Sequence, residues 1–287
     1  MTLVFDTRRD GWAQMQPVTQ SGASTGNWEA QNYGIQGVVA SPQGTLDLRL
    51  QTTSMGSAVT SGKIKSTFVL QDLAPTHGAL EVTFQIPLCE FWDSRPLGSF
   101  AYGLWPAIWL LPDSGAVGGW PCGGELDLFE SMHHTSNDAL RGFATAHFGA
   151  RTNQDYVYDG HWGAFLGQYP LTPEGTHVIR FEWQRLENGL WRFSQSIDGQ
   201  EVWTRTSWDT WHLGTDPSRY ARATQYECSL GAAGDPAQIF QRAFENPARG
   251  LHLICNLALG GTPFGQNYDH ALKTATMALQ HICIWKL

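Results

Sequence analysis

Three carboxylates fall within six residues of the sequence, in the run Gly-Glu125-Leu-Asp127-Leu-Phe-Glu130. In an extended strand alternate side chains share a face, so Glu125 and Asp127 point the same way and Glu130 points the other way. A β-bulge at Leu128-Phe129 would insert one residue and return Glu130 to the face of the other two. With that bulge, the strand predicts three convergent carboxyl groups.

Two carboxyl groups about 5–5.5 Å apart form the catalytic pair of retaining glycosidases. The Cα atoms of Glu125 and Glu130 would lie roughly 13 Å apart on a bulged strand, and their side chains can lean together across that distance. A third carboxylate between them raises at least one pKa, which keeps an acid protonated beside an ionised nucleophile. An exposed acidic strand or a cation site is the alternative. The interleaved Leu126, Leu128 and Phe129 argue against exposure, because they give the strand a buried side.

The elements that must position these acids are predicted to be strands. Short runs rich in β-branched and aromatic residues recur between turn residues, and the first two alternate apolar and polar with period two. Asp198-Gly199 is a hairpin turn signal, and residues 236–244 are at best one short helix. The strand runs cover residues 44–53, 79–86, 177–183, 190–197 and 277–285. Without a linker or repeat, the chain is predicted to be a single all-β domain over residues 1–287, a sandwich or barrel.

Composition narrows the class of ligand. The formal net charge is −8 and no Lys/Arg cluster is present, so nucleic-acid binding is excluded and a neutral ligand is favoured. No apolar stretch approaches the ~18 residues that span a bilayer, so no membrane association is expected. The chain holds 13 Trp although only 15% of its residues are charged. We expect about half of these Trp in the core and the rest in a sugar-binding cleft, where an indole face suits the C–H face of a sugar ring.

The cysteines indicate neither a disulfide framework nor a zinc site. They are odd in number and include no CxxC pair. They are Cys89, Cys122, Cys228, Cys255 and Cys283. The first residues lack the basic and apolar regions of a secretory signal. Two interpretations of the location therefore stay open: a cytoplasmic protein, or an extracellular one whose signal peptide has been removed.

The run from Trp120 to Glu130 closely resembles the active-site strand of glycoside hydrolase family 16, the laminarinase-like β-jelly rolls. Other segments resemble further parts of that family in the same order. They are Asn27-Trp28-Glu29-Ala-Gln31, Gly103-Leu-Trp105-Pro-Ala-Ile-Trp109-Leu-Leu-Pro, Thr145-Ala-His147-Phe-Gly, Thr176 to Gly199, Leu253 to Gly261 and Met277 to Trp285. The resemblance covers nearly the whole chain. It implies a β-jelly-roll sandwich of two curved antiparallel sheets with a concave substrate cleft.

The resemblance also implies roles for the acids. Glu125 corresponds to the nucleophile, Glu130 to the general acid/base, and Asp127 to the residue that tunes both. The extra residue before the second Glu is the bulged spacing of laminarinase-like and galactan-cleaving members. In the same family, the unbulged spacing belongs to lichenases and plant xyloglucan-modifying enzymes.

Substrate contacts are implied for a second set of residues. Trp120 and Trp105 match sugar-stacking positions, Asn27 or Glu29 would contact hydroxyls, and Trp109 is expected in the core. Lys63 stands where family members often place an arginine that holds a sugar, and it lacks the planar fork of arginine.

His147 would hydrogen-bond within the acid cluster or to the substrate. A metal role with His133 and His134 is disfavoured, because adjacent residues of a strand face opposite sides. A satisfied core histidine is the plainer alternative. Many relatives have a calcium-binding Asp where this chain has Gln280, and a neutral amide supplies no charge. We therefore expect no required cofactor and no catalytic metal; a structural calcium ion stays open but is disfavoured. The insert at residues 89–96 is expected to alter a rim of the cleft.

The function these residues favour is a retaining endo-β-glycosidase. It would act on β-1,3-linked or mixed β-1,3/1,4-linked glucan by double displacement, as a monomer. An endo-β-1,3-galactanase, a transglycosylase and a non-catalytic glucan-binding jelly roll are the alternatives. Family members that only bind glucan have typically lost the catalytic acids, whereas all three are present here. Sulfated galactans are disfavoured, because the sequence shows no basic cluster to receive sulfate.

Overall fold

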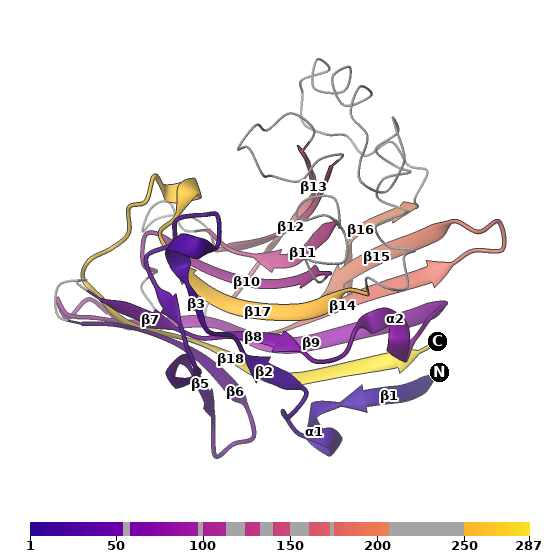
Figure 1. The fold of residues 1–287 in the computed structure, drawn as a ribbon, viewed down its shortest axis with the longest axis horizontal. Coiled ribbons are helices and arrows are strands. Elements are labelled where there is room, and N and C mark those ends of the chain that lie inside the picture. Colours follow the sequence, from indigo (N-terminus) through magenta and orange to yellow (C-terminus); the bar gives the residue numbers. More distant parts are fainter. Residues whose placement is uncertain are drawn as a thin grey trace.

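The structure is a computed structural model, and it describes residues 1–53, 58–96, 100–112, 124–132, 140–149, 161–172, 175–206 and 250–287. In these parts of the chain, two sheets of almost entirely antiparallel strands lie face to face, as Figure 1 shows. The α-helices described are single turns, α1 (Thr7–Asp10) and α2 (Leu70–Leu73), and none of the described helices is long and apolar enough to cross a membrane. The prediction of an all-β sandwich is confirmed.

The larger sheet has eleven strands. Its hydrogen-bonded order is β16 (Gln200–Thr206), β15 (Trp191–Ile197), β14 (Thr176–Arg185), β9 (His77–Phe91), β18 (Leu272–Lys286), β6 (Leu46–Thr52), β7 (Val59–Ser61), β4 (Asn32–Tyr33) and β3 (Gln20–Ser21), with β1 (Thr2–Asp6) on β18 and β5 (Val38–Ala40) on β6. The five predicted strand runs all lie in this sheet. The short helix predicted at 236–244 lies outside the described residues.

The smaller sheet has seven strands and carries the carboxylates. Its order is β13 (His161–Pro170), β12 (Arg141–Gly149), β11 (Glu125–Glu130), β10 (Leu104–Leu111), β17 (His252–Leu259), β8 (Lys63–Ser66) and β2 (Met15–Pro17). Strand β17 comes late in the chain but pairs with both β10 and β8. The acid-bearing strand therefore lies between its sequence neighbours β10 and β12, and a distant strand, β17, borders β10 on its other side. Three 3₁₀ turns complete the described elements, η1 (Gly22–Ser24), η2 (Ile35–Gly37) and η6 (Thr262–Phe264).

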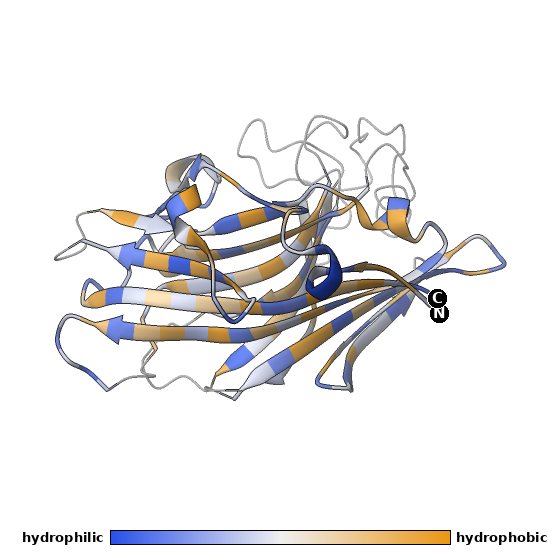
Figure 2. Cartoon of the chain, turned by 90° about the horizontal axis from the view of Figure 1, so that it is seen from below, coloured by the Kyte–Doolittle hydropathy of each residue, from blue (hydrophilic) through white to orange (hydrophobic). Residues whose placement is uncertain are grey.

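Every second side chain along many strands of both sheets enters the core between the sheets, and Figure 2 shows the corresponding alternation of hydrophobic and hydrophilic residues. Phe84 of the larger sheet meets Phe129 of the smaller one with ring centroids 4.7 Å apart. Within the larger sheet Phe181 stacks on Phe193 at an interplanar angle of 5° and on Trp183 at 27°. Burying such rings contributes more than any other contact to holding the sheets together.

The predicted turn at Asp198-Gly199 joins β15 to β16. Both residues have positive φ, 51° for Asp198 and 78° for Gly199. A two-residue hairpin loop needs this left-handed backbone to match the twist of its strands, and Asp-Gly supplies it at low steric cost. The hairpin prediction is confirmed.

Trp183 tests the core. Its side chain is fully buried and its Nε1 donates to the carbonyl of Ala74 at 2.9 Å. We expect Trp183→Ala to lower the free energy of unfolding by about 3–5 kcal/mol, because it leaves a cavity and an unpaired carbonyl. Trp28, which is 53% exposed, is the matched control. Trp28→Ala should change the free energy of unfolding by less than about 0.5 kcal/mol. Urea denaturation measures both. Equal losses in the two variants would contradict this account of the core.

Candidate active site

The carboxylates lie on β11, and the pairing of this strand contains the predicted bulge. On β10, Trp109 opposes Asp127 and Ala107 opposes Glu130, so Ile108 alone spans an interval that takes Leu128 and Phe129 on β11. The pairing with β12 shifts in the same interval. The extra residue turns Glu130 back to the face of Glu125 and Asp127. The predicted bulge at Leu128-Phe129 is confirmed.

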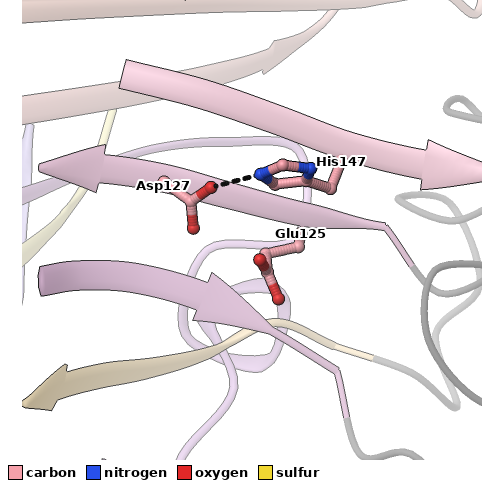
Figure 3. A group of neighbouring side chains, drawn as sticks. All are labelled: Glu125, Asp127 and His147. Atoms are coloured by element: carbon pink, nitrogen blue, oxygen red, sulfur yellow. Dashed lines mark ion pairs between the residues drawn. The ribbon is translucent and has the colours of Figure 1, made fainter. Parts of the chain in front are cut away.

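Glu125, Asp127 and His147 project from one face of the smaller sheet (Figure 3). This is the outer face, turned away from the larger sheet, because the intervening Leu126 and Leu128 are buried in the core. One side-chain ligand atom from each residue lies within 4.8 Å of the others. His147 is opposite Glu125 on β12, and its Nε2 lies 3.1 Å from Asp127 Oδ2. On the other side, Trp105 Nε1 donates to Glu130 Oε1 at 2.8 Å. The strands thus bring five predicted site residues together.

Burial raises the pKa values of two acids in this cluster. Asp127 is 5% exposed, and burial raises its pKa to about 8. Burial also raises the pKa of Glu130 to about 8; the charge of Asp127 adds to this rise, and the Trp105 bond and His147 oppose it. Near neutral pH the site therefore keeps a proton on a carboxyl group in the position of a general acid.

His147 completes the cluster by its bond to Asp127. A carboxylate pair with an imidazole at this spacing could also hold a cation. The imidazole, however, already engages the carboxylate that would share the ion. The prediction that the site needs no metal stays a prediction, and His133 and His134 lie outside the described residues.

The indole of Trp109 lies beside the acids, so the prediction that it belongs to the core is wrong. Trp105, Ala107 and Trp109 share the outer face of β10, and Trp109 is only partly buried. Its Nε1 donates to Asn256 Oδ1 on β17 at 2.7 Å. The physical reason is strand parity: a residue four positions from Trp105 on a regular strand faces the same way.

The segment before β4 is more enclosed than its resemblance implied. Glu29 is 9% exposed, and Oε2 accepts hydrogen bonds from Gln31 Nε2 at 2.5 Å and from the Tyr33 hydroxyl at 2.8 Å. Asn27 Nδ2 lies 3.5 Å from the other carboxylate oxygen. Both oxygens of Glu29 thus have protein donors, and a role in contacting substrate hydroxyls stays a prediction for Glu29 and Asn27.

Tyr33 links this segment to the outer face of β10, a connection that the sequence did not predict. Asn256 Nδ2 donates to the Tyr33 hydroxyl at 3.1 Å, while Asn256 Oδ1 accepts from Trp109. An indole can only donate, so the amide orientation of Asn256 is set and the hydroxyl must donate to Glu29. The spacing of Glu29 and Tyr33 gives no such signal, because the partner Asn256 lies far along the chain.

Lys63 lies over the rings of Tyr33 and Trp109. Its Nζ is 3.0 Å from Gln20 Oε1 and 5.3 Å from the ring centroids of both Tyr33 and Trp109. Burial lowers the Lys63 pKa, and the negative charges of Glu29 and Glu125 oppose that shift. Lys65 points to the same face, since Ile64 between them is buried in the core. Predicted substrate contacts through Lys63 would fall on this side of the acids.

Three other sequence predictions concern Trp120, the insert and the calcium position. Trp120 is outside the described residues. The insert that includes Arg95 is held to the chain after η6, since Arg95 makes a bidentate pair with Asp269 at 2.6 and 2.9 Å. Gln280, at the questioned calcium position, donates to Thr176 Oγ1 at 3.3 Å.

Together the fold and the site define a class: a β-jelly roll with a bulged strand of three carboxylates on the outer face of one sheet. No protein-family model matches the chain. A β-1,3-glucan-binding protein of Penaeus monodon is 29% identical over 217 residues, 71% of this chain and 47% of that protein. Glucan endo-1,3-β-glucosidase A1 of Niallia circulans is 26% identical over 203 residues, 69% of this chain and 24% of the relative. Keratan-sulfate endo-1,4-β-galactosidase of Sphingobacterium multivorum is 46% identical over 94 residues, 32% of this chain and 18% of the relative. The chain thus spans less than half the length of each of these relatives.

Solved structures match over almost the full length. The endo-1,3-β-glucanase of Streptomyces sioyaensis has a TM-score of 0.64 at 21% identity, covering 95% of this chain and 88% of that one. LamA of Zobellia galactanivorans, in complex with laminaritriose and laminaritetraose, has a TM-score of 0.62 at 19% identity, covering 99% of each chain. A glycoside hydrolase family 16 endo-glucanase of Bacteroides ovatus has a TM-score of 0.58 at 16% identity, covering 94% of each. The resemblance stated from the sequence is confirmed, and the jelly-roll fold with it.

Asp127 tests the electrostatics of the cluster. The negative charge of Asp127 raises the pKa of Glu130, so Asp127→Asn should move the alkaline limb of kcat/KM from near pH 8 to lower pH by about one unit. It should also stabilise the fold increasingly from pH 4 to pH 8. A carboxyl whose folded pKa is raised from 3.8 to about 8 loses its contribution across that window, and Asn does not titrate.

Both effects are measurable on one set of samples. Profiles of kcat/KM against pH give the pKa of the alkaline limb. Thermal melts at several pH values give the difference in stability between the variant and the wild type. A limb that stays in place, together with a pH-independent stability difference, would refute the assigned charges.

Proposed function

We propose that this chain is a retaining endo-β-glycosidase that hydrolyses β-1,3-linked or mixed β-1,3/1,4-linked glucan. The observation that carries the proposal is the bulge in β11, which turns Glu125, Asp127 and Glu130 to one face. Retaining glycosidases need one ionised and one protonated carboxyl group on either side of the scissile bond. Burial raises the pKa of Glu130, like that of Asp127, to about 8, so Glu130 is suited to hold the proton.

In the first step Glu125 attacks the anomeric carbon, while Glu130 gives its proton to the departing glycosidic oxygen. The bond from the anomeric carbon to that oxygen breaks as the bond to Glu125 forms. In the second step water attacks the same carbon, Glu130 takes the proton of that water, and the bond from the carbon to Glu125 breaks, which frees the Glu125 carboxylate. Asp127, held by His147 at 3.1 Å, adjusts the proton affinity of its neighbours. Two inversions at one carbon give the β-anomer as the first product.

A neutral glucan suits the chain better than a polyanion. The formal net charge is −8, and the indoles of Trp105 and Trp109 offer flat apolar faces beside the acids. The curated glucosidase and the glucan-binding protein both carry β-1,3-glucan in their names. LamA was solved with laminari-oligosaccharides. These findings support β-1,3-glucan as the substrate.

A binding protein without catalysis is the rival from another class. The Penaeus monodon relative is named for glucan binding alone. Against this rival stands the burial of the acids: Asp127 and Glu130 are 5% and 8% exposed, an arrangement that costs stability and serves no purpose in holding a neutral sugar. A reducing-sugar assay on laminarin separates the two. Transglycosylation uses the same residues and would appear as products longer than the substrate.

An endo-β-galactosidase is a second candidate, and one observation favours it. Lys63 and Lys65 project from the same face of β8, so two cations lie side by side where the sequence suggested no basic cluster. The 94-residue match to a keratan-sulfate galactosidase agrees with a galactan substrate. A panel of laminarin, mixed-linkage glucan, β-1,3-galactan and keratan sulfate tests the choice. Faster turnover of the two galactose polymers would replace the glucan proposal.

The two glutamates should respond differently to amide substitution. Glu125→Gln removes the nucleophile and should take turnover of every substrate below detection. Glu130→Gln removes only the proton donor, so hydrolysis of polysaccharide should fall by about 10²–10⁴-fold. An aryl glycoside with a good leaving group should still form the covalent intermediate. Azide should then restore turnover of that aryl glycoside and give a β-glycosyl azide.

Two outcomes would overturn this assignment. Proton NMR of the wild-type reaction that shows the α-anomer first would exclude double displacement. Azide rescue of Glu125→Gln rather than Glu130→Gln would reverse the roles of the two residues. Melting temperatures of both variants provide the control for folding.

Chelation tests the role of metals. The mechanism uses carboxyl groups and water, so kcat should be unchanged within error after EDTA treatment. A structural calcium ion would reveal itself as a lower melting temperature, and the neutral side chain of Gln280 makes that effect small. Loss of turnover at an unchanged melting temperature, reversed by a divalent cation, would contradict the carboxylate-only mechanism.

A further inference from the structure

The bulge that aligns the acids leaves a backbone group without a regular partner. Leu128 has no Cα partner on β10 or on β12, whereas Asp127 and Glu130 have partners on both. Its side chain is fully buried in the core between the sheets. A carbonyl that leaves the ladder in such a place must find other donors or remain costly and unsatisfied.

Two buried side chains supply those donors. The Tyr169 hydroxyl on β13 donates to the Leu128 carbonyl at 3.0 Å, and Gln195 Nε2 on β15 donates to it at 2.7 Å. Tyr169 is 4% exposed and Gln195 is 1% exposed. Because β15 belongs to the larger sheet, the bulge of one sheet is bonded directly to the other.

The geometry of both donors is determined by their neighbours. Trp203 is opposite Gln195 on β16, and its Nε1 donates to Gln195 Oε1 at 2.8 Å. An indole only donates, so the amide of Gln195 must turn its Nε2 to Leu128.

Tyr169 reaches β11 by crossing β12 at Gly142. A Cβ at Gly142 would lie 2.3 Å from the Tyr169 ring, so no larger residue fits beneath it. Burial, and then the charge of Glu130, raise the pKa of Tyr169, which keeps the phenol protonated and able to donate.

We propose that Tyr169, Gln195 and Trp203 form a bulge clamp: by bonding the carbonyl of Leu128 they hold β11 in its bulged register and so position the side chain of Glu130. The three are positioning residues, since none of them touches the substrate. The inference rests on the proposed function for its catalytic readout. If β11 relaxed toward a regular strand, Glu130 would turn away from Asp127 and lose its bond to Trp105.

A clamp differs from ordinary core bonding in what its loss changes. Removing any buried hydrogen bond lowers stability. Removing the clamp should also displace Glu130, which lowers kcat while substrate binding by the remaining residues keeps KM. As Glu130 turns from the outer face toward the core, it loses its bond from Trp105 and becomes more enclosed, so its pKa should rise further.

The test compares Tyr169→Phe and Gln195→Met with Thr52→Val. Thr52 is a buried residue of the larger sheet whose hydroxyl donates to the carbonyl of Leu272. Thr52→Val therefore removes a comparable buried hydrogen bond at a site away from β11. The clamp variants should lower kcat by about 10–100-fold with KM within about twofold, the loss typical of a small misplacement of a catalytic group. Thr52→Val should keep kcat within about twofold at a similar loss of melting temperature.

A second readout needs no substrate. Carboxyl ¹³C NMR titration, with the Glu130 signal assigned through Glu130→Gln, should give a higher Glu130 pKa in both clamp variants and an unchanged one in Thr52→Val. Clamp variants that lose only stability, with kcat and the Glu130 pKa as in Thr52→Val, would overturn the proposal. A wild-type protein that cleaves no glucan or galactan would refute the proposed function, and the titration would then still decide the clamp.

Discussion

The site depends on one extra residue in one strand. A regular strand places every second side chain on a face, and the interval from Asp127 to Glu130 is odd. The bulge converts that odd interval into an even one, as the pairings with β10 and β12 both show. Without it Glu130 would point into the core where Phe129 packs, and Phe129 would take its place among the acids. The distribution of charge across the sheet follows from this local irregularity.

The bulge is tolerated because the core around it accommodates both of its consequences. Phe129 enters the core and packs against Phe84 of the other sheet at 4.7 Å. The displaced carbonyl of Leu128 receives two side-chain donors. On the opposite face of the strand, burial withdraws water from Asp127 and Glu130 and raises the pKa of each to about 8. The bulge thus separates apolar packing on one face of β11 from the buried acids on the other.

On the other side of the acids, a chain of hydrogen bonds plays a comparable part. It runs from Trp109 through Asn256 and Tyr33 to Glu29. Each link has one direction, since it begins at an indole that can only donate and ends at a carboxylate. Asn256, which orients the indole of Trp109 within the smaller sheet, is therefore itself bonded to Tyr33 of the larger sheet. Lys63, which lies over the rings of Trp109 and Tyr33, balances the charge of Glu29.

The sequence by itself determined the strands, the hairpin turn at Asp198-Gly199 and the bulged spacing of the acids, because each of these depends on neighbours within a few residues. It also indicated the resemblance to laminarinase-like jelly rolls and His147 as part of the acid cluster. Only the tertiary structure showed that Glu29 is enclosed and that Leu128 is bonded by Gln195. Those contacts join residues far apart in the chain, such as Tyr33 with Asn256, and no local pattern encodes them. Trp109 was expected in the core, and only the pairing of β10 with β11 and β17 showed that its indole lies on the outer face beside the acids.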